Sequence, residues 1–118
     1  MMNLEIRKVA DNATDEERVV LYALADCNLN DYLLFDSTYD EEGNISNKYR
    51  HMFVFPDQNV KKGDFVWIYS KDGMHTSVAM IRILLYIYYW GLKNHVWNND
   101  GDTVHLIHYD GYIYKNVE

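Results

Sequence analysis

Five histidines and a single cysteine are the side chains in this sequence best suited to metal binding or acid–base catalysis. His105 and His108 are three residues apart, which on a strand places them on opposite faces, and no His-Glu-x-x-His pattern occurs. One cysteine can form neither an intramolecular disulfide nor a cysteine-rich metal site. We therefore expect no structural metal and no cofactor. The six residues are His51, His75, His95, His105, His108 and Cys27.

A nucleophile beside a base is the second arrangement that could support chemistry. The fold could bring Ser46 or Cys27 next to His51, which would suggest a small hydrolase. Neither residue lies in a Gly-x-Ser-x-Gly elbow or in another turn motif that exposes a nucleophile. We predict that the domain is not an enzyme, and a small hydrolase centred on His51 and nearby carboxylates is the second alternative function.

Residues 97–102, Trp-Asn-Asn-Asp-Gly-Asp, gather several oxygen ligands around one glycine, which could suggest calcium. The spacing of an EF-hand loop is absent, and short amide and carboxylate side chains commonly accept hydrogen bonds from the amides of their own turn. We predict a structural turn with a tryptophan anchored in the core beside it. The residues are Trp97, Asn98, Asn99, Asp100, Gly101 and Asp102.

Charge and length limit the class of partner. The chain has 118 residues and a formal net charge of −7, so its field repels phosphate backbones and anionic lipid headgroups. Lysines and arginines are scattered instead of forming a basic stripe. We expect one domain over residues 1–118, no membrane or nucleic-acid partner and, without a signal-peptide pattern, a cytoplasmic location.

The residue pattern predicts an all-β fold. Eleven tyrosines and three tryptophans fit pleated sheet surfaces, and Asp-Gly pairs at 72–73, 100–101 and 110–111 separate apolar runs as hairpin turns do. Residues 17–26 fit a helical period as well as a strand period, and we favour a strand because Val19, Val20 and Tyr22 prefer sheets. We also expect positive φ angles at Gly101 and Gly111, so that valine there would destabilise the fold.

The run at residues 78–90, VAMIRILLYIYYW, is too short to cross a bilayer of about 30 Å as a helix. As one strand with a bend or bulge, it would direct Ile81, Ile83, Leu85 and Ile87 into the core. The alternate residues would face outward and form a homodimer or partner interface. These interface residues are Met80, Arg82, Leu84, Tyr86 and Tyr88.

Several motifs of the C-terminal half occur together in one known family. They are Phe-x-Phe-Pro at 53–56, Lys-Gly at 62–63, Trp-Gly at 90–91 (Trp90 and Gly91), the turn at 97–102 and Asp-Gly at 110–111. In this order they resemble the bacterial lamin-tail domain over about residues 50–117, whereas residues 1–49 depart from it. The resemblance implies an immunoglobulin-like antiparallel β-sandwich that acts in protein interaction and not in catalysis.

The predicted function is therefore a non-enzymatic protein-interaction or self-assembly module. The first alternative is a domain that binds a small ligand of the carbohydrate type through exposed tyrosines and Trp90. An interaction module should expose a flat apolar patch, a ligand-binding domain should contain a concave aromatic pocket, and an enzyme should pair a histidine with a nucleophile in a cleft.

Overall fold

The computed structural model describes residues 2–39, 45–92, 96–97, 102–111, 113 and 115–117. Within these residues the chain forms strands and one short 3-10 turn, Leu29–Asp31, and no helix is long and apolar enough to cross a membrane. The predicted all-β class is confirmed. The strands are β1 (Leu4–Ala10), β2 (Arg18–Ala23), β3 (Cys27–Asn28), β4 (Tyr32–Tyr39), β5 (Ile45–Val54), β6 (Asn59–Val60), β7 (Phe65–Tyr69), β8 (Thr76–Met80), β9 (Ile83–Tyr89) and β10 (Thr103–His108).

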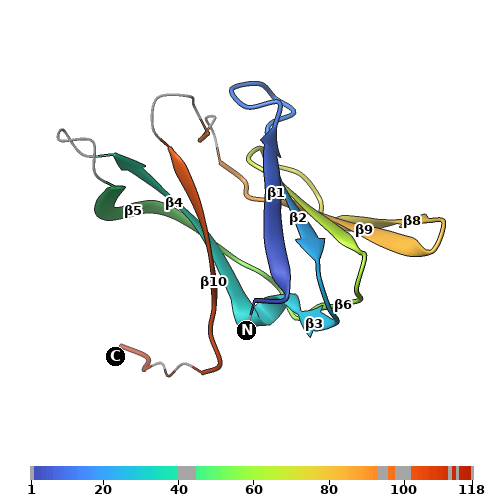
Figure 1. Ribbon diagram of the computed structural model, residues 1–118. Helices are drawn as coiled ribbons and strands as arrows, with labels where there is room; N and C mark the ends of the chain where they lie inside the picture. Colours follow the sequence, from blue (N-terminus) through green and yellow to red (C-terminus); the bar gives the residue numbers. More distant parts are fainter. Residues whose placement is uncertain are drawn as a thin grey trace.

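Two larger sheets and one small ribbon make up the molecule (Figure 1). The five-stranded sheet has the order β1-β2-β7-β9-β8, the three-stranded sheet has the order β10-β4-β5, and β3 pairs with β6. The pairing is antiparallel except between β7 and β9, which run parallel, so the predicted fully antiparallel arrangement is wrong at that point. The chain passes from β7 to the edge strand β8 and returns as β9, which lies between them. Because β9 is antiparallel to β8, it runs in the same direction as β7.

Alternating residues of the strands supply one buried cluster to which both larger sheets contribute. In β2, Val19, Leu21 and Ala23 are fully buried, which confirms the predicted strand in residues 17–26. Trp97 belongs to the same cluster, with only 3% of its surface exposed, and confirms the predicted core anchor. The cluster also contains Leu4, Leu29, Tyr32, Leu34, Phe53, Phe55, Val60, Val66, Ile68, Tyr86, Tyr88 and Val96.

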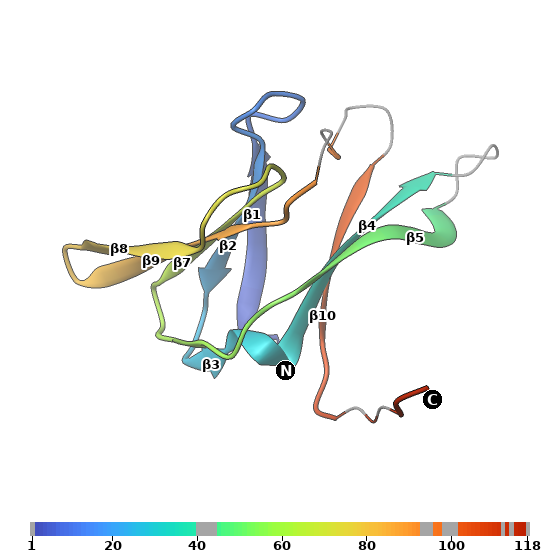
Figure 2. The same ribbon diagram turned by 180° about the vertical axis from the view of Figure 1, so that it is seen from behind.

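The apolar run at 78–90 is not one bent strand. Residues 81 and 82 form a turn, Arg82 has a φ angle of 70°, and β8 folds back on β9 from Thr76↔Ile87 to Met80↔Ile83. This hairpin projects from the body of the protein in both views (Figures 1 and 2). Because a turn falls inside the run, its two halves lie on different strands.

The predicted faces of this run are reversed. Tyr86 and Tyr88 point into the core, where the Tyr88 ring lies about 6 Å from the rings of Phe53 and Phe55. Ile81 at the hairpin tip is 92% exposed. Both faces of the run are apolar, so alternation alone could not show which one is buried, and the large tyrosine rings fill the space between the sheets.

The Asp-Gly pairs at 72–73 and 110–111 do not form the predicted hairpin turns, because β7 and β8 on either side of the first are not paired with each other and no strand among the described residues follows the second. At Gly111 no positive φ occurs and an added Cβ would meet no atom within 4 Å, so the dependence expected there is wrong. Gly101 lies outside the described residues. Asp72 accepts a hydrogen bond from the amide of Gly73 at 3.1 Å, and Gly73 packs beneath the Tyr89 ring.

Replacing Gly73 with alanine should destabilise the protein by about 1–3 kcal/mol, the usual cost of overpacking. A Cβ at this position would lie 2.4 Å from Cδ1 of Tyr89, whose ring stacks on Tyr69 at 5.1 Å between centroids. Urea denaturation measures the change, and Gly111→Ala, which meets no neighbour, should leave the midpoint unchanged. Equal midpoints for the two variants would contradict the contact with Tyr89.

Candidate functional site

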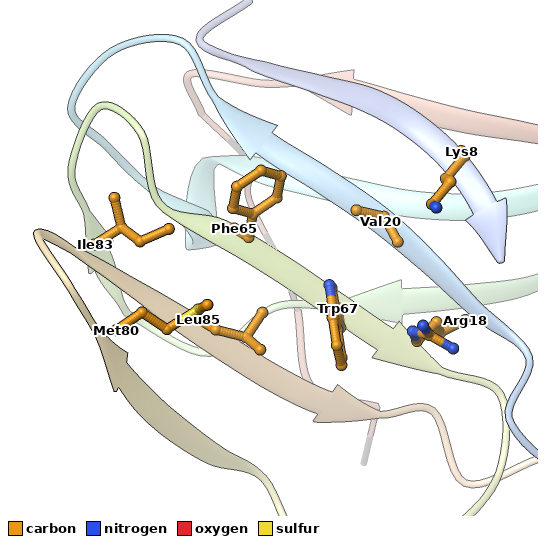
Figure 3. Close-up of a pocket in the computed structure, with 8 residues that line it drawn as sticks. All are labelled: Lys8, Arg18, Val20, Phe65, Trp67, Met80, Ile83 and Leu85. Carbon is orange, nitrogen blue, oxygen red and sulfur yellow. The ribbon is translucent and has the colours of Figure 1, made fainter.

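The outer face of the five-stranded sheet contains an apolar hollow of about 330 Å³ (Figure 3). Its walls are apolar because the outward-facing residues of β2, β7 and β9 are apolar, like the inward-facing ones. Val20 is opposite Trp67 in the β2–β7 pair, and Phe65 is opposite Leu85 in the β7–β9 pair. Lys8 and Arg18 lie at one end of the hollow, and Met80 and Ile83 lie at the other. The lining residues are Lys8, Arg18, Val20, Phe65, Trp67, Met80, Ile83 and Leu85.

Arg18 lies flat against the aromatic wall. Its guanidinium carbon is 4.5 Å from the centroid of the Trp67 ring, within the range of a cation–π contact. Nη1 donates to Oδ2 of Asp11 and to the carbonyl oxygen of Glu16, both at 2.9 Å. Nε is buried and has no hydrogen-bond partner among the described residues. Lys8 stands opposite Val20 in the β1–β2 register.

Aromatic rings extend this face beyond the hollow. The rings of Tyr22 and Phe65 are 5.0 Å apart, those of Trp67 and Tyr69 are 6.2 Å apart, and Tyr69 stacks on Tyr89. Burial against these neighbours raises the pKa of Tyr69, and Arg18 partly opposes the shift. The outer face is therefore both apolar and aromatic, although a sheet face that meets only water is usually polar.

The β8 strand forms a free edge of this sheet. All five of its residues are exposed, including Val78 at 45% and Met80 at 54%. The amide of Leu84 donates to Oδ1 of Asp64 at 2.9 Å and so faces away from β8. Leu84 is opposite Ala79, so these two residues form a pair without backbone hydrogen bonds between them. In an antiparallel ladder such pairs alternate with hydrogen-bonded pairs, so Ser77, two residues from Ala79, is of the same kind. The backbone groups of Ala79 and Ser77 therefore point away from β9, towards the open edge.

The predicted interface residues occupy four different environments. Met80 lines the hollow, Arg82 is exposed at the hairpin turn, and Leu84 is 37% exposed. Tyr86 and Tyr88 are core residues, so the prediction that they face outward is wrong. Burial raises the pKa of Tyr88 to about 12 and also raises that of Tyr86.

The other predicted motif residues are structural where they are described. Trp90 donates from Nε1 to the carbonyl oxygen of Met52 at 3.2 Å, and Gly91 has a φ angle of 80°. Asp102 immediately precedes β10, and residues 98–101 lie outside the described part of the chain. Among the described residues, no three histidine, cysteine, aspartate or glutamate side chains gather in a way that could hold a metal ion.

Two histidine pairs were not predicted from the sequence. Oγ of Ser37 lies 2.7 Å from Nε2 of His105, and Oδ1 of Asp36 lies 3.1 Å from Nδ1 of His51. Asp36 and Ser37 are both fully buried and follow each other on β4, so they point to opposite faces of the sheet. Residues far apart in the chain form both pairs, and no local spacing indicates them.

The nucleophiles considered from the sequence occupy other places. Burial raises the pKa of the Cys27 thiol, the hydrogen bond with Tyr32 partly opposes this shift, and the charges of Asp31 and Asp26 add to it. These surroundings disfavour the reactive thiolate. His51 instead contacts Asp36 and lies nearly perpendicular to the Trp90 ring, with 6.4 Å between the ring centroids. The side chain of Ser46 lies outside the described part of the structure.

No family model matches this sequence, and no curated protein has significant sequence similarity to it. Phe53 and Phe55 of the lamin-tail-like motif are core residues, and Gly63 has the left-handed φ angle of 94° that its turn needs. The Asp-Gly pair at 110–111 precedes no strand in the described residues. The site itself defines the class: an all-β domain with an apolar outer sheet face and an exposed edge strand, β8.

Proposed function

We propose that this domain is a non-enzymatic self-assembly module in which the free edge of β8 pairs with β8 of a second copy. The observation that carries the proposal is the exposed β8 strand, whose outward backbone groups at Ser77 and Ala79 match those of another strand. Such addition of a strand to a sheet edge is a common mode of protein recognition.

A two-fold arrangement satisfies the geometry of the edge. With the axis at Val78, Ser77 of each copy stands opposite Ala79 of the other, and each such pair exchanges two backbone hydrogen bonds. Val78 then meets its own equivalent, and the outer faces of the two sheets continue into each other. The pairing joins the two apolar faces into one surface and leaves neither β8 edge unpaired.

Charge favours a second copy at this position. The chain carries a net charge of −7, yet residues 76–89 contain a single charged residue, Arg82. Two identical acidic proteins meet with least repulsion through this segment. Edge strands in monomeric proteins usually carry a lysine, a proline or a bulge that prevents pairing, and β8, Thr76–Met80, has neither of these residues.

Replacing Ala79 with proline should convert the dimer to a monomer. The amide of Ala79 points away from β9, so proline removes a donor of the interface without removing a bond of the hairpin. Sedimentation velocity over micromolar concentrations measures the species, and circular dichroism checks that the fold is retained. Ala79→Thr keeps the amide and should remain dimeric. A wild-type chain that is monomeric throughout this range contradicts self-assembly.

We further propose that the two larger sheets form an immunoglobulin-like sandwich of the lamin-tail type. The shared core and the buried aromatic residues of the Phe-x-Phe-Pro segment support this relationship. An experimental structure of the whole chain, compared with lamin-tail domains, tests it: a different strand order would contradict membership.

A further inference from the structure

We propose that the hollow on the outer face of the five-stranded sheet binds an amphipathic carboxylate, with its apolar chain over Trp67 and Leu85 and its carboxylate beside Lys8 and Arg18. This inference goes beyond self-assembly, because it concerns the face of the sheet and uses charged residues that are distant from the free edge of β8 in the strand order.

The hollow suits the apolar part of a small ligand. Val20 and Leu85, exposed to only 5% and 7%, form its floor, and the rings of Phe65 and Trp67 flank them (Figure 3). Its volume of about 330 Å³ lies at the lower end of the range for ligand sites and equals about eleven water volumes. A chain of roughly ten carbon atoms matches this size. Met80, which is flexible and half exposed, can adjust to the ligand.

The opposite end of the hollow is positively charged. The side chain of Lys8 makes no hydrogen bond or ion pair with any described residue. Arg18 pairs with Asp11, and Glu16 pairs with Lys71, which leaves the charge of Lys8 uncompensated. Within the described part of the chain, Nη1 is the one guanidinium nitrogen of Arg18 that donates hydrogen bonds, so the group retains donors for an anion. In a chain of net charge −7, this end of the hollow selects a negative group.

The lining also separates this ligand class from the carbohydrate expected as an alternative. Six of the eight lining side chains are apolar, and the other two are cations. A sugar needs several side-chain donors and acceptors to replace the water that it loses. An aliphatic carboxylate needs an apolar floor and one anion-binding end, which is what these residues provide.

Three probes of equal chain length, decanoate, decanol and decylammonium, test the proposal by isothermal titration at low ionic strength and below micelle-forming concentrations. Decanoate should bind tightest and decylammonium weakest. Lys8→Gln should weaken decanoate binding about two- to fivefold, the usual effect of one exposed charge, and leave decanol binding unchanged. Added salt should reduce the difference between decanoate and decanol.

Two variants separate this site from the edge of β8. Met80→Ser, at an exposed position that tolerates substitution, should weaken decanoate and decanol binding alike. Ala79→Pro should abolish self-assembly and leave decanoate binding unchanged, so that either proposal can fail without the other. Equal affinity for decanoate and decanol, unaltered decanoate binding by Lys8→Gln, or no saturable binding of any probe would overturn the inference.

Discussion

Glu17→Gln should lower the free energy of unfolding by about 3 kcal/mol, the largest effect we expect from one conservative change. Glu17 is only 1% exposed, and each of its two carboxylate oxygens accepts two hydrogen bonds. Oε1 accepts from the amides of Ala13 and Trp97, and Oε2 accepts from Oγ of Ser70 and the amide of Val96. An amide side chain has one oxygen, so in either orientation its NH₂ group would face at least one backbone N–H, that of Val96 or those of Ala13 and Trp97.

The neighbouring Glu16 provides a matched control for this prediction. Glu16 is 59% exposed and pairs with Lys71 at 3.3 Å, an arrangement that contributes about 0–1 kcal/mol. Glu16→Gln should therefore leave the urea midpoint almost unchanged, while Glu17→Gln moves it strongly. If both variants unfold at the wild-type midpoint, the carboxylate of Glu17 does not hold the segment containing Trp97 against the turn between β1 and β2.

Stability should fall between about pH 10 and pH 12 by roughly 2–3 kcal/mol through Tyr88 alone. Burial raises the pKa of Tyr88 from 10.0 to about 12, with a smaller contribution from Tyr86. The neutral phenol is favoured in the folded state, so its contribution is complete below the unfolded pKa near 10. Between these two pKa values the folded state still holds the proton that the unfolded state has released, so the free energy of unfolding falls as the pH rises. The stabilisation from the neutral phenol is lost once the pH has passed the folded pKa near 12.

Urea unfolding at pH 8, 10 and 11.5 measures this loss, and Tyr88→Phe is the control. Phenylalanine cannot ionise, so the variant should lose less stability than the wild type over the same interval. A smaller decline should persist in the variant, because burial also raises the pKa of Tyr32, Tyr69 and Tyr86. Parallel declines in the two proteins would contradict the assignment to Tyr88.

Local patterns in the sequence were sufficient for the class of fold and for several of its elements. Val19 and Tyr22 indicated the strand at β2 through their preference for a pleated backbone, and Trp97 was predicted correctly as a core residue. These features depend on side-chain type and on a period of two, both of which operate within a few residues. The exposure of Met80 was also predicted, because an apolar run of that length offers more surface than one small core can cover, whereas Ile81 was wrongly expected in the core.

Tertiary structure decided which apolar face became core and where charged residues were placed. Both faces of residues 78–90 are apolar, and only the space between the sheets selected Tyr86 and Tyr88 over Ile83 and Leu85. The buried carboxylate of Glu17 is stabilised by the amides of Val96 and Trp97, which lie about 80 positions later in the chain. Strand pairing likewise brings Lys8 and Met80 to one hollow. Such contacts join residues that are distant in the sequence, so they cannot be predicted from composition or periodicity.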